Sequence, residues 1–80
     1  MSAAEAQEVK DLLLRSNDHY RQLSERHHQL EDRLNHLTQL PHPTATEQVE
    51  EVTLKKRKLA LKDQMEQMAL EYAKTHYRAS

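Results

Sequence analysis

The stretch Leu40-Pro41-His42-Pro43 divides this chain in two and holds both of its prolines. Each proline biases the residue before it towards extended geometry, so Leu40 and His42 disfavour a helix. Elsewhere the chain has no glycine and is rich in Leu, Glu, Gln, Lys, Arg and Ala, which are strong helix formers. Aromatic residues, which strands favour, are scarce. We therefore expect an all-α chain with one clear connection.

Apolar residues before this break recur at alternating spacings of three and four. With polar exceptions at Ser16 and His27, the positions are Ala6, Val9, Leu13, Ser16, Tyr20, Leu23, His27, Leu30, Leu34 and Leu37. This heptad pattern predicts one apolar face on a helical first arm, from about residue 3 to about residue 39. Ser2 is placed to cap its first turn.

The stretch Ser16-Asn17-Asp18 is the weak point of this arm. Asn17 and Ser16 are good N-caps, and Asp18 suits the first turn of a new helix. A short helix could therefore end near Arg15 and a longer one begin at Asp18, or one helix could continue through. The unbroken register favours collinear helices with a kink at most.

After the break, Thr44 and Glu47 have the spacing of a capping box, which predicts a helix beginning at Ala45. We expect this second arm to run from about residue 45 to about residue 77. A connection as short as residues 40–44 makes consecutive helices antiparallel neighbours. The sequence thus predicts one domain, residues 1–80, built as an antiparallel two-helix hairpin with coiled-coil-like packing.

The second arm carries apolar residues on two sides when its positions are placed 100° apart. One side, predicted to pack against the first arm, holds Leu54, Leu61, Met65, Met68 and Tyr72. The opposite side, a candidate oligomer face, holds Val49, Val52, Leu59, Leu70, Ala73 and Tyr77. The first arm can cover only one of them, so the other predicts a dimer or larger helical bundle. Alternatively, Leu59 and its neighbours wrap the edge of one wide core face.

The composition supports self-association. A two-helix scaffold buries little apolar surface, and without cysteine neither disulfides nor thiolate metal sites can stabilise it.

The formal net charge of −1 gives no long-range attraction to nucleic acid or anionic lipid. No apolar run approaches the ~20 residues of a membrane span, and the N-terminus lacks the order of a signal peptide. We expect a cytoplasmic protein without membrane contact.

The run Lys55-Lys56-Arg57-Lys58, with Lys62 beyond it, suggests a second class of function. Nucleic-acid binding requires several cationic side chains on a shared surface. Four consecutive helical residues point in four directions, and Glu51 is placed to pair with Lys55 at i, i+4. A solvated charged face is therefore the favoured interpretation, and nucleic-acid association is the alternative.

Two groups of histidines differ in position. His28, Asp32 and His36 recur every four residues on an exposed face, but nothing else in the chain completes a metal site, so we expect no metal or cofactor. His27 lies in the heptad row of the first arm, which, together with the side of the second arm that packs on it, we call the seam. In a hairpin it would lie opposite Lys58 to Leu61. Hydrogen-bonded across the arms, or to an acid such as Asp63, it would fix the register of the helices.

Catalysis has no support in the sequence, which lacks a glycine-rich phosphate loop and a nucleophile, base and acid on rigid neighbouring elements. We therefore expect a non-enzymatic protein-interaction or assembly module that binds itself and an unidentified protein partner.

Two stretches resemble the YdcH-like proteins, a family of small bacterial helical proteins of uncharacterised function. They are Tyr20-x-x-Leu23-x-x-x-His27-x-x-Leu30-x-x-x-Leu34 and the run from Leu54 to Met65, within residues 17–69. The resemblance implies a bacterial cytosolic hairpin, and supplies no activity or ligand. The positions that carry the pattern include His27, Lys58, Leu59, Leu61, Lys62 and Asp63. Asp18 stands where the family often has proline, and Gln64 where it has an acid.

Overall fold

A computed structural model describes residues 2–76 of the chain. The described part contains three helices and no strand: α1 (Ala3–Ser16), α2 (Asp18–Thr38) and α3 (Ala45–His76). The prediction of an all-helical chain is confirmed. The molecule is elongated, with principal extents of 52 × 23 × 17 Å. None of the helices within residues 2–76 combines the length and apolar character that crossing a membrane requires.

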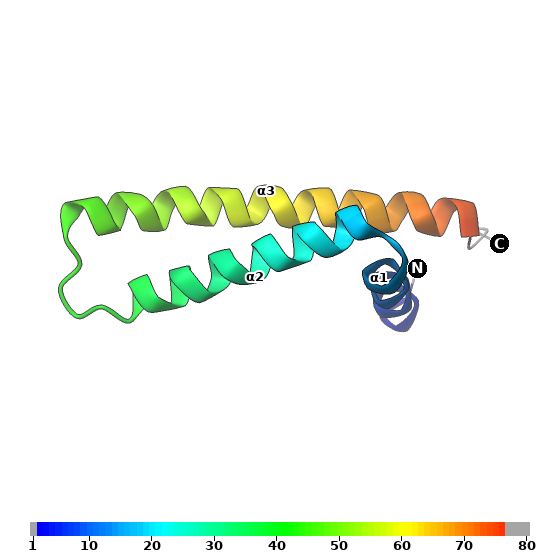
Figure 1. The fold of residues 1–80 in the computed structure, drawn as a ribbon, viewed down its shortest axis with the longest axis horizontal. Helices are drawn as coiled ribbons and strands as arrows, with labels where there is room; N and C mark the ends of the chain where they lie inside the picture. The colour runs from blue at the N-terminus through cyan, green and yellow to red at the C-terminus, as the bar shows by residue number, and fades with distance from the viewer. Residues whose placement is uncertain (1, 77–80) are drawn as a thin grey trace.

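Helices α2 and α3 lie side by side and run in opposite directions, joined by the proline-containing connection (Figure 1). The capping box at the start of α3 is confirmed. The Thr44 amide donates to Glu47 Oε1 over 2.9 Å, and the Glu47 amide donates to Thr44 Oγ1 over 3.1 Å. These bonds satisfy amide groups that a helix start leaves without partners, so α3 begins cleanly at Ala45.

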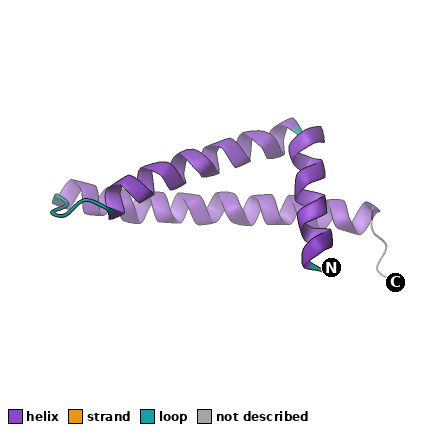
Figure 2. Ribbon diagram, turned by 90° about the horizontal axis from the view of Figure 1, so that it is seen from below, coloured by secondary structure: helices purple, strands orange, loops and turns teal. Residues whose placement is uncertain are grey.

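Helix α1 does not continue the line of α2 but turns across the far end of the molecule and packs on both other helices (Figure 2). The expectation of collinear helices is therefore wrong. The physical reason is Asn17, whose extended backbone (φ −124°, ψ 109°) interrupts the helix for one residue. The alternative interpretation, a short helix followed by a longer one, describes the structure.

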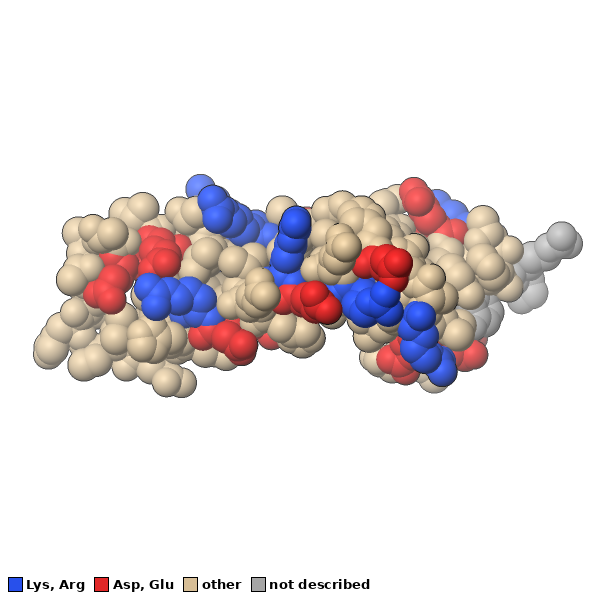
Figure 3. Space-filling model, in the orientation of Figure 1, with Lys and Arg blue, Asp and Glu red and all other residues tan. Residues whose placement is uncertain are grey.

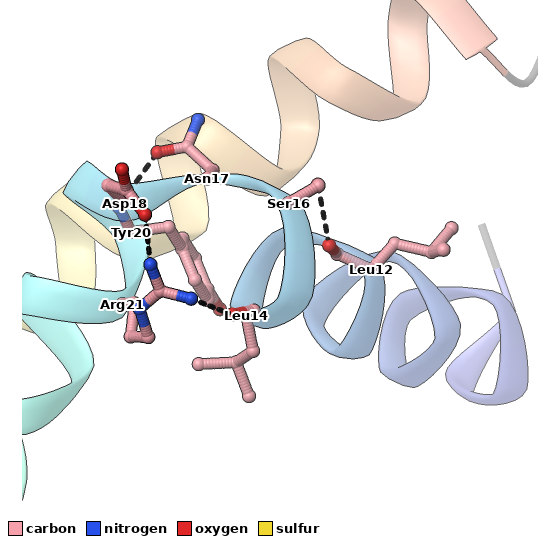
Figure 4. Close-up of polar contacts among 7 residues, drawn as sticks. All are labelled: Leu12, Leu14, Ser16, Asn17, Asp18, Tyr20 and Arg21. Carbon is pink, nitrogen blue, oxygen red and sulfur yellow. Dashed lines mark hydrogen bonds and ion pairs between the residues drawn. The ribbon is translucent and has the colours of Figure 1, made fainter.

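Side chains on both sides of Asn17 hold this corner (Figure 4). Asn17 Oδ1 accepts from the Tyr20 amide over 2.9 Å and caps α2, while the Asn17 amide still donates to the Leu13 carbonyl at the end of α1. Arg21 forms an ion pair with Asp18 and donates to the Leu14 carbonyl. Asn17 and Arg21 thus donate back to carbonyls at the end of α1, so local hydrogen bonds define the corner.

Among the described residues the buried apolar side chains form two clusters, and Leu23 is buried outside both. One lies where α1 crosses and joins Val9, Leu13, Tyr20 and Ala69, with Met65, Met68, Tyr72 and Ala73 packed against it. The other lies near the connection and joins Leu34, Leu37 and Leu54, with Leu30 and Leu40 packed against it. Between them, the contact between α2 and α3 includes His27, Glu31 and Lys58.

Candidate interaction surface

The face of α3 that meets α2 and α1, its inner face, is covered by the chain itself. Leu54 is buried, with 8% of its surface exposed, and Leu61, Met65, Met68 and Tyr72 are half-buried. On α2, the predicted seam residues Tyr20, Leu23, Leu34 and Leu37 are buried, and His27 and Leu30 are half-buried. The structure thus brings the predicted seam residues of both arms to the contact between the helices or next to α1.

The opposite, outer face of α3 carries four large apolar side chains in water. The exposed fractions are 66% for Val49, 54% for Val52, 59% for Leu59 and 47% for Leu70. These side chains do not wrap the edge of a wide core face. Figure 1 shows α1 and α2 on the same side of α3, and within residues 2–76 no other helix lies along its opposite side.

Two residues predicted for this outer face are placed differently. Ala73 is half-buried and packs against the cluster at α1, because α1 crosses α3 at that point; the expectation that it belongs to the uncovered face is wrong. Tyr77 lies outside the described residues.

His27 lies at the contact between α2 and α3, with 18% of its side chain exposed. Its Nδ1 is 3.5 Å from Glu31 Oε1, and Lys58 Nζ of α3 is 3.6 Å from the same oxygen. Glu31 therefore links His27 to the opposite helix. The expectation that Asp63 supplies the acid is wrong, since Asp63 is exposed and forms no ion pair within residues 2–76. The i, i+4 spacing of His27 and Glu31 was the available signal.

One nitrogen of this group lacks a partner. Nε2 of His27 is buried and has no hydrogen-bond partner among the described atoms. A buried polar atom without a partner costs free energy, on the order of 1–3 kcal/mol. His27 thus introduces a weak point between the two apolar clusters.

Ligand atoms of His27, His28 and Glu31 lie within 4.8 Å of one another. Imidazole and carboxylate are common zinc ligands, but here the Lys58 ammonium already lies beside the carboxylate. The set considered from the sequence, His28, Asp32 and His36, does not form such a group among the described residues. An ion pair between the helices accounts for this arrangement without a metal.

The basic run of α3 is divided among different surroundings. Lys55 pairs with Glu51 at 3.0 Å, and Lys58 pairs with Glu31 across the helices. Lys56, Arg57 and Lys62 are exposed. Acidic and basic side chains alternate along the face seen in Figure 3, and no continuous positive patch forms there. This distribution disfavours binding to a row of phosphates.

A shallow open groove lies between α2 and α3, lined by Arg26, Gln29, Leu30, Arg57, Ala60, Leu61 and Gln64. It combines a small apolar floor with cationic and amide groups, and it contains no nucleophile, carboxylate or imidazole. The groove was not expected from the sequence, because its lining alternates between two helices.

Comparison with known proteins gives one result. A family model described as "Protein of unknown function (DUF465)" matches residues 21–69, which comprise most of α2, the connection and most of α3. No curated protein and no solved structure matches the chain. The match leaves α1 outside and agrees with the resemblance seen in the sequence. Since it covers more than half of the chain, the protein belongs to this family of unknown function, which includes the YdcH-like small proteins.

Proposed function

We propose that this protein is a non-enzymatic interaction module: a helical hairpin of α2 and α3 that self-associates through the outer face of α3 and so assembles into a helical bundle. The exposure of Val49, Val52, Leu59 and Leu70 on one helix carries the proposal. Single exposed apolar residues are ordinary on protein surfaces, but a row along one uncovered helix face is typical of an interaction site.

The same geometry favours binding over catalysis. The two core clusters are packed with apolar side chains. The groove between α2 and α3 is open, and its lining has no acid–base or nucleophilic group. An enzyme ordinarily has a concave pocket in which such groups converge. The proposal includes a cytoplasmic location, which the family resemblance implies, and a further protein partner.

Sedimentation equilibrium of the purified chain at micromolar concentration tests self-association. We expect a mass of a dimer or larger, and a monomer mass for Leu59→Glu, which places a charge in the middle of the outer face. Gln64→Glu introduces the same charge away from this face and should leave the mass unchanged. A monomer mass for the unaltered chain would refute the proposal.

Nucleic-acid association is the competing class, and salt discriminates between them. Binding through phosphate contacts weakens steeply with salt, whereas burial of apolar side chains does not. We expect no binding to duplex DNA or RNA at physiological salt. Salt-dependent binding that is lost in Lys56→Gln/Arg57→Gln would favour the nucleic-acid function instead.

A further inference from the structure

The outer face of α3 continues a heptad pattern beyond its apolar residues. At alternating spacings of three and four, the positions are Val49, Val52, Lys56, Leu59, Asp63, Glu66, Leu70 and Ala73. We call this row the outer stripe. All of its residues are exposed except Ala73 at the edge of α1. A strict heptad row is the pattern by which two helices pack along their whole length.

The charged residues of the outer stripe distinguish between partner orientations. If two copies of α3 packed in parallel and in register, each residue would face its own copy. Lys56 would then meet Lys56, and Asp63 and Glu66 would each meet the same acid. Like charges placed opposite one another across an interface are unfavourable, so the stripe is poorly suited to parallel pairing.

Antiparallel pairing gives the opposite result. We infer that a second copy of this chain docks antiparallel on the outer stripe, with Lys56 facing the partner's Glu66. In this register Val52 faces the partner's Leu70 and Leu59 faces the partner's Asp63. At the two ends Val49 faces the partner's Ala73, which α1 already half-buries. The twofold axis repeats each contact, so one dimer has two Lys56–Glu66 pairs.

Only registers that differ by seven residues keep stripe residues opposite one another. A shift of one heptad in one direction sets Asp63 against the partner's Glu66, which brings acids together. A shift in the other direction sets Val52 against the partner's Asp63 and leaves Lys56 opposite Leu59. The charges therefore select one register among the antiparallel alternatives.

The residues that flank the stripe near the twofold axis differ between its two edges. On one edge the two copies of Ala60 face each other, and their small side chains allow the helices a close approach. On the other edge the two copies of Lys62 face each other, and each precedes an Asp63 in the chain. This like-charged pair offsets part of the gain from the Lys56–Glu66 pairs. The two Leu59–Asp63 contacts are the least favourable of the register, so Asp63→Leu should tighten the dimer.

Cysteine cross-linking tests the register, because the natural chain has no cysteine. Under mild oxidation, an equal mixture of Val52→Cys and Leu70→Cys should give a disulfide-linked heterodimer, while neither variant alone cross-links efficiently. A mixture of Gln64→Cys and Leu70→Cys, with one cysteine off the stripe, is the matched control and should stay uncross-linked. Self-cross-linking of Val52→Cys would indicate parallel pairing and overturn the inference.

Charge exchange is the second measurement and requires no new bond. Lys56→Glu and Glu66→Lys should each weaken dimerisation about tenfold, because each creates a like-charged pair. The double variant should restore it. No recovery in the double variant would overturn the register.

The inference rests on the proposed function, and the two fail differently. A monomer mass for the unaltered chain in sedimentation equilibrium refutes self-association itself. A dimer mass, with neither the Val52–Leu70 cross-link nor recovery in the double variant, refutes only this register. Circular dichroism of each variant verifies that its helices are intact.

Discussion

The inner and outer faces of α3 carry similar apolar side chains in opposite surroundings. On the inner face, Leu54 is packed among Leu34 and Leu37, with 8% of its surface exposed. On the outer face, Leu59 lies little more than one turn away and has 59% exposed. The inner residues pack within one chain, whereas the outer residues keep about half or more of their surface exposed there. This row of exposed apolar residues is the basis of the proposed self-association.

The largest expected difference in the free energy of unfolding is that between Leu54→Ala and Leu59→Ala. Removing a buried leucine leaves a cavity, so Leu54→Ala should lower the free energy of unfolding by about 2–3 kcal/mol. Leu59→Ala should change it by less than about 0.5 kcal/mol in the monomer. Urea unfolding at sub-micromolar concentration measures both. Equal losses in the two variants would mean that the two faces do not differ.

His27→Leu tests the polar part of the contact between α2 and the inner face of α3. It removes the buried, unpartnered Nε2 and leaves Glu31 paired with Lys58, so stability should rise by about 1–2 kcal/mol. Thermal unfolding followed by circular dichroism measures the gain. His28→Leu, at a side chain with 71% exposed, is the control and should give none. Loss of helicity in His27→Leu would show that the histidine holds a network that folding requires.

Asn17→Ala tests the corner that places α1 on the inner face. Its Oδ1 caps α2 through the Tyr20 amide, and loss of such a cap costs about 1 kcal/mol. Asn35→Ala, within α2 and exposed, is the matched control and should not destabilise the chain. Urea unfolding distinguishes them, and an unchanged midpoint for Asn17→Ala would exclude the capping role.

The smallest effect on stability comes from the capping box at the start of α3. The Thr44 amide, which donates to the carboxylate, lowers the pKa of Glu47 from its usual 4.5, with the Thr44 side chain as a further cause. The folded state therefore favours the ionised form. The stabilisation is present above pH about 4.5 and is lost as pH falls through the lowered pKa. Glu47→Gln should lack this component, which unfolding curves of both proteins at several acidic pH values would reveal.

Much of the fold follows from the sequence because its determinants are local. Two prolines end the first arm, Thr44 and Glu47 define the start of α3, and heptad spacing identifies the residues that α2 and α3 bury. The direction of α1 does not follow, since the heptad register continues unbroken through Ser16 and Tyr20. A single extended residue at Asn17 turns the chain without disturbing that spacing.

The candidate site shows the same division. Helical projection predicts that Val49, Val52, Leu59 and Leu70 share a face, because that depends on one helix alone. The placement of Ala73 depends on where α1 crosses, and the pairing of Glu31 with Lys58 depends on how two helices align. No pattern within a single helix of the sequence predicts either arrangement.

The positions of the two core clusters also set an order for folding. Residues that meet near the connection, such as Arg33 and Glu50, are 17 positions apart in the chain, whereas Val9 and Ala69 in the other cluster are separated by about 60. Closing the longer loop costs about 1 kcal/mol more chain entropy. The pairing of α2 with α3 should therefore begin at the connection and spread away from it, and α1 should dock last. A chain shortened to begin at Asn17 would keep the early steps of folding and lose only the final one.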